Sequence, residues 1–341
     1  MNQICISRLD KIGDMILTLP AIKAIKTANP NMHISVLASE YNSKVLQGIN
    51  YIDKIIIVNT NSNFLTLLKR IIFIRKINFD FFLNVSPTIL SYFFCFFSNS
   101  KIKATLIFLS RYKKSIYSKL FTRLFAKIFC NYVHVIDRCS KLKNNENLHQ
   151  TNMIIEMIKI CKISVDNNPI IEIVLPKKKL NLTPLNKTLI TIHLSEKWIN
   201  KFYTENNLLE LFIQLPKEKY IYVLTTDNFN KNKFKKIYKN YLVIDNNNFS
   251  KINKLNNSIT ILDKLSYQNW VQIIYSSNLV ITPECGCTHI SSACKVPVII
   301  IYDSNNLPDA IYKEYHPWKS QHKKLVFDDI KLNKKIINNL K

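Results

Sequence analysis

Residues 6–26 read ISRLDKIGDMILTLPAIKAIK, which joins an apolar run, a polar turn and a helical pattern. The apolar run predicts a buried strand, and the apolar spacing after the turn predicts a helix. Gly13 lies where the strand gives way to the helix, and glycine allows a tight turn or the close approach of a ligand. Asp14 follows at the helix start, where an acidic residue is also favourable for the helix dipole alone. This stretch predicts the strand–turn–helix unit of an α/β fold.

The same alternation extends outward from this unit along nearly the whole chain and favours parallel sheets covered by helices. Strands are expected at 3–7, 33–38, 54–59, 79–85, 103–108, 188–193, 220–225, 258–262, 279–282 and 296–302. Helices are expected at 14–28, 40–47, 64–76, 113–130, 148–162, 204–214, 267–276 and 286–294. A stretch with three prolines at 166–187 separates two such series. The sequence therefore predicts two doubly wound, Rossmann-like domains at 1–165 and 188–341, joined by that linker and facing each other across a cleft.

The length of 341 residues suits two domains, and the 47% of hydrophobic residues is enough to form their packed cores. The formal net charge of +25 suits a polyanionic partner such as nucleic acid, an anionic membrane or a phosphorylated glycolipid. A general excess of Lys, Asn and Ile, with only three Gly, gives part of this charge a purely compositional origin. The charge alone does not separate these possibilities.

The N-terminal residues predict a cytoplasmic protein, because Arg8, Asp10 and Lys11 interrupt any apolar signal segment. The eight cysteines form no CxxC pair and indicate reduced thiols rather than a disulfide framework. The apolar segment 79–97 contains Asp80 and Pro87 and is too interrupted for a membrane span. A buried strand, a turn at Ser86-Pro87 and a short buried helix are expected there instead.

A second strand–turn–helix unit lies at 279–300, LVITPECGCTHISSACKVPVII, with Gly286 in its turn. A helix start presents free backbone N–H groups and a positive dipole end, which suits a diphosphate. Thr288 and His289 add a hydroxyl and an imidazole on the same turn. The three glycines are too far apart for a GxGxxG or GxxxxGK[ST] loop, which excludes NAD-dependent dehydrogenases and P-loop NTPases. The Cys285, Cys287, His289 spacing does not match zinc ligation, and no metal is expected.

These two motifs together resemble glycosyltransferase family 9, the ADP-heptose:lipopolysaccharide heptosyltransferase family. The resemblance rests on Arg8-Leu9-Asp10-Lys11-Ile12-Gly13-Asp14 followed by Thr18-Leu19-Pro20-Ala21, on Glu196-Lys197-Trp198, and on Glu284-Cys285-Gly286 followed by His289. The motifs occur in the family's order over nearly the whole chain. Two departures concern the late signature, where the family usually has Asp at 284 and Ser or Thr at 285. A third is the absence of the family's Gly-rich turn after the strand at 220–225.

The resemblance implies a GT-B type enzyme that transfers heptose from ADP-heptose to a lipopolysaccharide core acceptor with inversion, without metal or cofactor. Asp14 would be the catalytic base, and the acceptor-side loop would contribute Arg8, Lys11 and Gly13. The nucleotide-sugar site would comprise Lys197, Glu284, Gly286, Cys287, Thr288 and His289. The implied partners are the nucleotide-sugar donor, a lipid A-core glycolipid and the inner face of the inner membrane, where the protein would be peripheral.

The helical pattern at 113–130 carries apolar residues on one side and Lys and Arg on the other. It suits a surface helix packed on its own domain, or a basic amphipathic element that touches membrane or acceptor lipid. In the second case Arg111, Lys113, Lys114, Arg123 and Lys127 would hold the protein at the lipid surface. Two other functions stay open: the same reaction with another nucleotide sugar or acceptor, and a non-catalytic nucleic-acid-binding protein. No nucleic-acid-binding motif is present, and no nucleic-acid partner is expected.

Overall fold

The computed structural model describes residues 2–86, 88–109, 116–138, 148–184, 186–198, 202–226, 234–252, 255, 257–328 and 331–340. The chain divides into two compact units. The first unit is Met1–Val174 with Lys313–His316, and the second is Leu175–Tyr312 with Pro317–Lys341. Each unit is built around one parallel β-sheet.

The first unit contains a six-stranded sheet in the order β3-β2-β1-β4-β5-β6, which is the strand order of a Rossmann fold. Its strands are β1 (Gln3–Arg8), β2 (His33–Ser39), β3 (Lys54–Val58), β4 (Phe81–Asn84), β5 (Ile102–Phe108) and β6 (Tyr132–Ile136). Its helices are α1 (Ile12–Ala28), α2 (Phe64–Arg75), α3 (Ile89–Phe97), α4 (Ile116–Phe129) and α6 (Gln150–Ile160), with the 3-10 helix η1 (Ser43–Leu46). The central strands β1 and β4 are almost entirely buried because helices cover both faces of the sheet.

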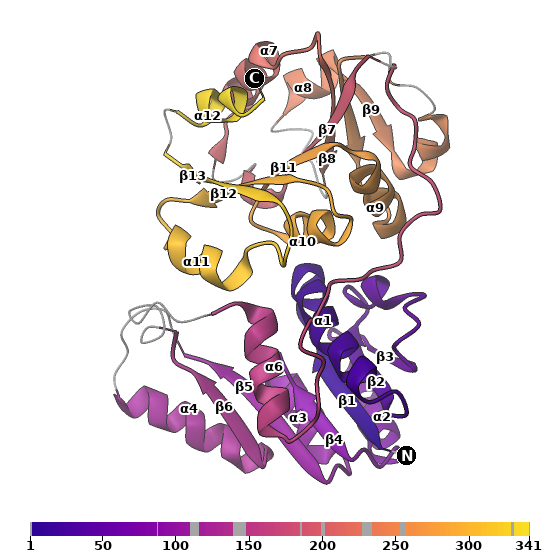
Figure 1. The fold of residues 1–341 in the computed structure, drawn as a ribbon, viewed down its shortest axis with the longest axis vertical. Helices are drawn as coiled ribbons and strands as arrows, with labels where there is room; N and C mark the ends of the chain where they lie inside the picture. The colour runs from indigo at the N-terminus through magenta and orange to yellow at the C-terminus, as the bar shows by residue number, and fades with distance from the viewer. Residues whose placement is uncertain are drawn as a thin grey trace. The chain divides into compact units, whose positions relative to one another are not determined.

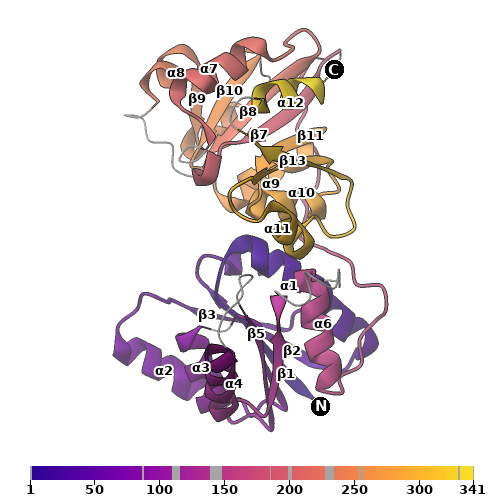
Figure 2. The ribbon, with the colours of Figure 1, turned by 90° about the vertical axis from the view of Figure 1, so that its left-hand side faces the viewer.

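Two layers of helices enclose this first sheet. Helix α1 packs against α6 on one face, and α2, α3 and α4 lie in a row on the other (Figures 1 and 2). Ile74 of α2, Cys95 of α3 and Ala126 of α4 join one buried apolar cluster with Cys5 and Phe82 of the sheet. The inner sides of these three helices are therefore fixed by core packing.

The second unit contains a seven-stranded parallel sheet in the order β13-β12-β11-β7-β8-β10-β9. Without the edge strand β9, this is again the Rossmann order. Its strands are β7 (Thr188–His193), β8 (Tyr220–Thr226), β9 (Leu242–Asp245), β10 (Ile259–Asp263), β11 (Leu279–Pro283), β12 (Val298–Asp303) and β13 (His322–Phe327). Its helices are α7 (Glu205–Gln214), α8 (Lys235–Asn240), α9 (Tyr267–Ser276), α10 (Gly286–Ala293), α11 (Pro308–Tyr315) and α12 (Leu332–Asn338), with the 3-10 helix η3 (Asn246–Lys251).

The predicted α/β class with two Rossmann-like sheets is confirmed, and several local predictions are wrong. The strands β6, β9 and β13 were not expected. The helix expected at 40–47 is only the 3-10 helix η1. Helix α3 is not fully buried, since Phe93, Phe96 and Phe97 are exposed on its outer side. In the described part of the chain, no helix is long and apolar enough to cross a membrane.

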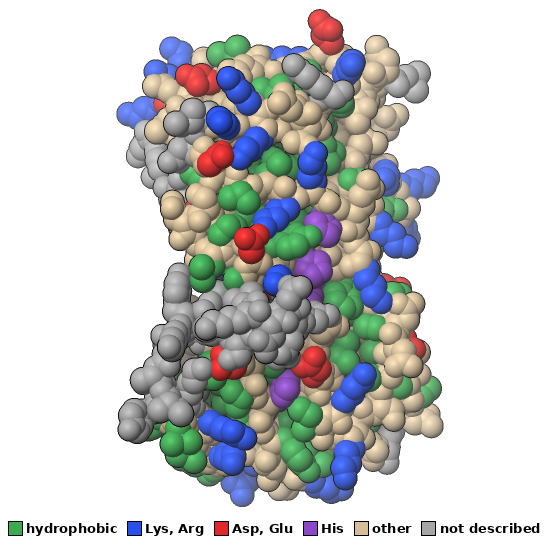
Figure 3. Space-filling model, turned by 60° about the vertical axis from the view of Figure 1, so that its left-hand side comes forward, with side chains coloured by type: hydrophobic (Ala, Val, Ile, Leu, Met, Phe, Trp, Pro, Cys, Tyr) green, Lys and Arg blue, Asp and Glu red, His purple; other side chains and the backbone are tan. Residues whose placement is uncertain are grey.

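Each sheet has one point where the strand order reverses. In the first unit it lies between β1 and β4, where Ser7 pairs with Asn84. In the second unit it lies between β7 and β11, where Ile192 pairs with Ile281. Ligands of doubly wound sheets bind beyond the carboxyl ends of the strands at such switch points. Lys and Arg side chains are spread over the surface in Figure 3, so the overall charge does not by itself mark a site.

Candidate functional site

The switch point of the first unit is organised by the buried side chain of Arg8, the last residue of β1. Its Nε donates to Asp10 Oδ1 at 2.7 Å, and its Nη2 lies 2.9 Å from Asp14 Oδ1. Its Nη1 donates to the carbonyl oxygen of Val85, just after β4, at 3.0 Å. Only 3% of the Arg8 side chain is exposed. A buried guanidinium needs such partners, and here it holds two carboxylates, one in the loop after β1 and one in the first turn of α1, and ties them to the backbone after β4.

The four acceptor-side residues expected from the sequence take distinct places in this arrangement. Asp14 lies in the first turn of α1, where the helix dipole also stabilises a carboxylate. Lys11 precedes that helix as its N-cap, is exposed, and makes no side-chain cap hydrogen bond. Gly13 is helical and buried, and of the three glycines Gly48 alone has a positive φ. Of the two roles that the sequence left open for Gly13, a tight turn does not occur, and the lack of a side chain remains the property that a ligand could use.

Asp10 is a functional candidate that the sequence analysis missed. Burial raises the pKa of its carboxyl group; Arg8 opposes this shift, and the nearby charge of Asp14 adds to it. A carboxylate with a raised pKa is a better proton acceptor than an ordinary one. Its position two residues after Arg8 in the same loop was visible in the sequence, but its burial was not.

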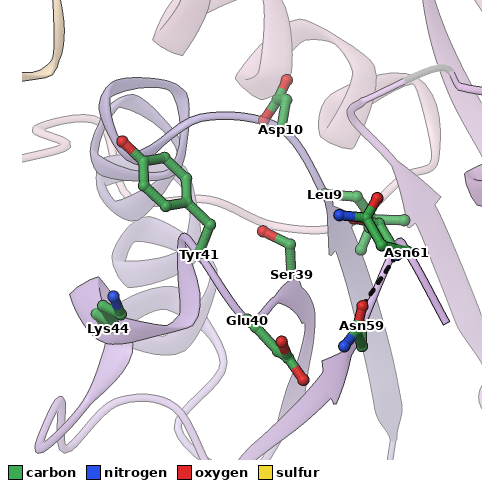
Figure 4. A pocket seen from close by; sticks show the side chains of 9 residues that line it. Leu9, Asp10, Ser39, Glu40, Tyr41, Lys44, Asn59 and Asn61 are labelled. Carbon is green, nitrogen blue, oxygen red and sulfur yellow. Dashed lines mark hydrogen bonds between the residues drawn. The ribbon is translucent and has the colours of Figure 1, made fainter. Parts of the chain in front are cut away.

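A cavity of about 540 Å³ opens beside Asp10 in the first unit (Figure 4). Its walls come from the carboxyl ends of three strands and comprise Leu9, Asp10, Ser39, Glu40, Tyr41, Lys44, Asn59, Thr60 and Asn61. The buried Asn42 holds the wall in place, since its Nδ2 donates to the carbonyl oxygens of Arg8 and Asp10 at 3.0 and 3.2 Å. The volume lies in the range of small-ligand sites. The sequence did not reveal this pocket because its residues belong to three separate loops.

The switch point of the second unit brings together Lys197, after β7, and Glu284, after β11. The Lys197 ammonium donates to the carbonyl oxygen of Glu284 at 2.6 Å and forms an ion pair with its carboxylate. Lys197 is 44% exposed and Glu284 18%. The cavity beside them measures only about 20 Å³, which is enough for one water molecule. The two residues expected at the nucleotide sugar are adjacent, but they bind each other.

Helix α10 begins beside this pair, with Cys285 as N-cap and Gly286 as first residue. The side chains of Cys287, Thr288 and His289 are buried. The Thr288 hydroxyl lies 3.5 Å from the carbonyl oxygen of Pro283, a weak hydrogen bond within the turn. These buried side chains leave the backbone N–H groups of the first turn as the groups best suited to an anion.

Cys285 and His193 form a second pairing that the sequence analysis missed. His193 ends β7, and its Nδ1 lies 3.0 Å from the Thr225 hydroxyl. Burial acts to raise the pKa of the half-buried Cys285 thiol, but its hydrogen bond and charge interaction with His193, together with hydrogen bonds to Thr282 and to the Cys287 backbone, outweigh burial, and the pKa is lowered. The two residues are 92 positions apart in the sequence, and only the pairing of β7 with β11 brings them together.

Several buried polar atoms at the carboxyl edge of the second sheet have no hydrogen-bond partner within the described residues. They are Ser195 Oγ, Thr226 Oγ1, Asp263 Oδ1 and Tyr302 Oη. The other carboxylate oxygen of Asp263 accepts from the Tyr238 hydroxyl at 3.1 Å. An unpartnered buried polar group costs free energy, so these atoms indicate where a polar ligand would be stabilised. Among the residues that the structure describes, no three His, Cys, Asp or Glu side chains gather to hold a metal ion.

The fold is that of two-domain glycosyltransferases. A glycosyl transferase family 9 structure from Veillonella parvula DSM 2008 is similar at a TM-score of 0.69 and 15% identity, covering 98% of this chain and 89% of that one. The E. coli heptosyltransferase WaaC with ADP is similar at 0.68 and 13%, covering 99% and 98%. E. coli ADP-heptose lps heptosyltransferase II is similar at 0.69 and 12%, covering 100% and 97%. No protein-family model and no curated protein sequence matches the chain.

Proposed function

We propose that this protein is an inverting, metal-independent glycosyltransferase that moves heptose from ADP-heptose to a lipopolysaccharide core acceptor. The observation that carries the proposal is the opposite chemistry of the two switch points. The first presents two carboxylates held by Arg8, and the second presents Lys197 at the start of helix α10. A carboxylate suits a hydroxyl that must lose a proton, and a cation beside a helix start suits a diphosphate.

The acceptor occupies the first domain, residues 1–165, in this proposal. Its hydroxyl gives its proton to the Asp14 carboxylate while its oxygen bonds to C1 of the heptose. The bond between C1 and the diphosphate oxygen breaks on the opposite face, and its electron pair leaves with ADP. Arg8 orients Asp14 through the 2.9 Å contact, while Lys11 and Gly13 form the loop beside the acceptor.

The donor occupies the second domain, residues 188–341. Lys197 and the positive dipole end of helix α10, at Gly286, Cys287 and Thr288, stabilise the negative charge that develops on the departing diphosphate. Glu284 accepts from a ribose or sugar hydroxyl once Lys197 has turned from it toward the diphosphate, and His289 supports the turn from within. The unpartnered atoms of Ser195, Thr226 and Asp263 support a polar ligand at this edge of the sheet.

The acceptor of the proposed reaction is a lipid A-core glycolipid, and the protein is cytoplasmic and peripheral at the inner membrane. Of the basic residues expected to hold it there, Arg123 and Lys127 are exposed on α4. Arg111, Lys113 and Lys114 lie outside the described residues. These cations suit the phosphates and carboxylates of such an acceptor.

Thermal unfolding with a panel of ADP-, UDP- and GDP-sugars tests the donor. A ligand that binds only the folded state stabilises it by about 2.7 kcal/mol at 100 times its Kd. ADP-heptose should raise Tm in the wild type and much less in Lys197→Ala. Lys101→Ala, which breaks the exposed pair with Asp80 in the other unit, is the matched control and should keep the full shift.

The same panel separates the alternatives. Stabilisation by a UDP- or GDP-sugar would keep the reaction and change the donor, which the departures at Glu284 and Cys285 would then explain. Salt-sensitive DNA binding without a response to any nucleotide sugar would favour the nucleic-acid-binding alternative and contradict the proposal.

A further inference from the structure

The outer side of helices α2, α3 and α4 exposes an unusual concentration of large apolar side chains. Of the twenty-four exposed large hydrophobic residues in the described chain, five lie on α2, four on α3 and five on α4. The most exposed of these fourteen are Phe64 at 75%, Ile89 at 73%, Phe121 at 72% and Ile128 at 68%. Scattered apolar residues are normal on a protein surface, but a contiguous patch marks an interaction site.

These side chains form one surface because the three helices are neighbours on the same face of the first sheet (Figure 2). The helices use their other sides, through Ile74, Cys95 and Ala126, to cover the core. On the outer side the aromatic rings stack on one another: the ring centroids of Phe93 and Phe97 lie 6.3 Å apart, and those of Phe121 and Phe125 lie 6.5 Å apart. The exposed side chains are therefore surplus to the packing of the sheet.

The charge of this region is almost entirely of one sign. The sequences of helices α2, α3 and α4 contain six Lys and Arg and no acidic residue. Cations lie directly beside exposed rings: Arg70 lies 5.7 Å from the Phe73 ring and Lys103 5.8 Å from the Phe96 ring. In Figure 3, hydrophobic and basic side chains are interspersed on the lower part of the molecule. An apolar surface interspersed with cations fits a partner that is apolar within and anionic at its edge.

We propose that the outer surface of α2, α3 and α4 inserts into the interfacial layer of an anionic phospholipid bilayer. Its Phe, Leu and Ile side chains enter the boundary of the acyl chains, and its Lys and Arg side chains bind the headgroups, as in interfacial helices. A second copy of this surface would bring like charges face to face. Nucleic-acid phosphates would leave the aliphatic side chains of Ile89, Leu124 and Ile128 without a partner.

This insertion deepens the proposed peripheral membrane location, for which only charged residues were named. It needs neither donor nor acceptor, so vesicle binding can fail while transfer to a soluble acceptor persists, and the reverse. The two proposals are therefore tested separately.

Sedimentation with vesicles of phosphatidylcholine and phosphatidylglycerol tests the insertion. Phe121→Ser/Ile128→Ser should lower the partition coefficient by about tenfold or more, since two apolar side chains no longer leave water. Ile213→Ser is the matched control: Ile213 is 71% exposed but lies on α7 of the other unit, and binding should be unchanged. The substituted side chains are exposed, so Tm should stay the same in all variants.

A second readout reports the depth of insertion. Phe121→Trp should show a blue-shifted emission on binding and quenching by brominated acyl chains, whereas Ile213→Trp should show neither. Binding that is equal in Phe121→Ser/Ile128→Ser and the wild type would overturn the proposal. So would its complete loss at about 0.5 M NaCl, where screening leaves only the apolar contribution. If light scattering showed a dimer for the wild type and a monomer for the double variant, the surface would be assigned to contact with a second copy instead.

Discussion

The two switch points occupy equivalent positions in two Rossmann-type sheets, yet they place their charges in opposite ways. In the first unit a buried cation, Arg8, lies between two partly exposed carboxylates beside a cavity of about 540 Å³. In the second unit a half-exposed cation, Lys197, closes on one carboxylate and leaves a cavity of about 20 Å³. The first arrangement is open and locally negative, and the second is closed and backed by a helix start.

Two sheets with the same strand order can therefore place differently charged groups at equivalent strand ends. Arg8 is fixed by three contacts, so in the proposed reaction its role is to position the carboxylates that it holds. Lys197 is exposed, and such a pair is worth only about 0–1 kcal/mol, so a diphosphate can displace Glu284 from it at little cost. One cation is a fixed support, and the other is available to a ligand.

Removing the proposed base should have the largest effect. Asp14→Asn keeps an oxygen toward Arg8 but cannot take a proton, and we expect transfer to fall about 1,000-fold. The thermal shift with donor should be unchanged, because the substitution lies in the other unit. Steady-state rates of sugar transfer provide the measurement.

Asp10→Asn is the matched control for this loss. It removes the second carboxylate of the same cluster, and we expect a decrease below about tenfold. A greater loss in Asp10→Asn than in Asp14→Asn would move the base to Asp10 and leave the contrast between the two units intact. Full activity in Asp14→Asn would contradict the assignment of Asp14 as the base in the first unit.

Replacing each of the two cations by a neutral side chain should have the next largest effect, and the loss of stability should differ between them. Arg8→Met leaves Asp10 and Asp14 without their buried partner and should lower the free energy of unfolding by about 3 kcal/mol or more. Lys197→Met breaks an exposed pair and should cost about 1 kcal/mol or less. Urea unfolding of both variants measures the difference, and equal losses would show that the two cations have the same role.

The smallest expected effect concerns the Cys285 thiol. Because its pKa is lowered, more thiolate is present at a given pH, and iodoacetamide should modify it at a lower pH than an ordinary thiol. In His193→Gln burial remains while the main opposing interaction is lost, so the pKa should rise and the rate at neutral pH should fall several-fold.

Peptide mapping identifies the modified residue, with Cys285→Ser as the blank. ADP should slow the modification if the start of helix α10 binds a diphosphate. A pH profile that is unchanged in His193→Gln would show that the imidazole does not control this thiol.

The alternation of strand and helix patterns predicted two Rossmann-like domains. The motifs that contain Arg8, Gly13, Asp14, Lys197 and Gly286 predicted a place for each of these residues near a strand end. That much was readable because strand and helix periods and turn residues are local properties of a sequence. The strands β6, β9 and β13 were missed, although residues 132–136, YVHVI, carry the β-branched pattern of a strand. The prediction of an α-helix at 40–47 was also wrong, because only a few residues determine the structure of so short a segment.

The fold class, the two strand–turn–helix motifs and the excess of positive charge follow from local patterns in the sequence. Tertiary structure alone decided that Asp10 joins Arg8 and Asp14, that Lys197 binds Glu284, and that His193 lies against Cys285. It also decided that three separate helices present one apolar surface. The physical reason is that burial, ion pairing and pKa depend on neighbours in space, and the order of strands in a sheet brings together residues that lie far apart in the chain.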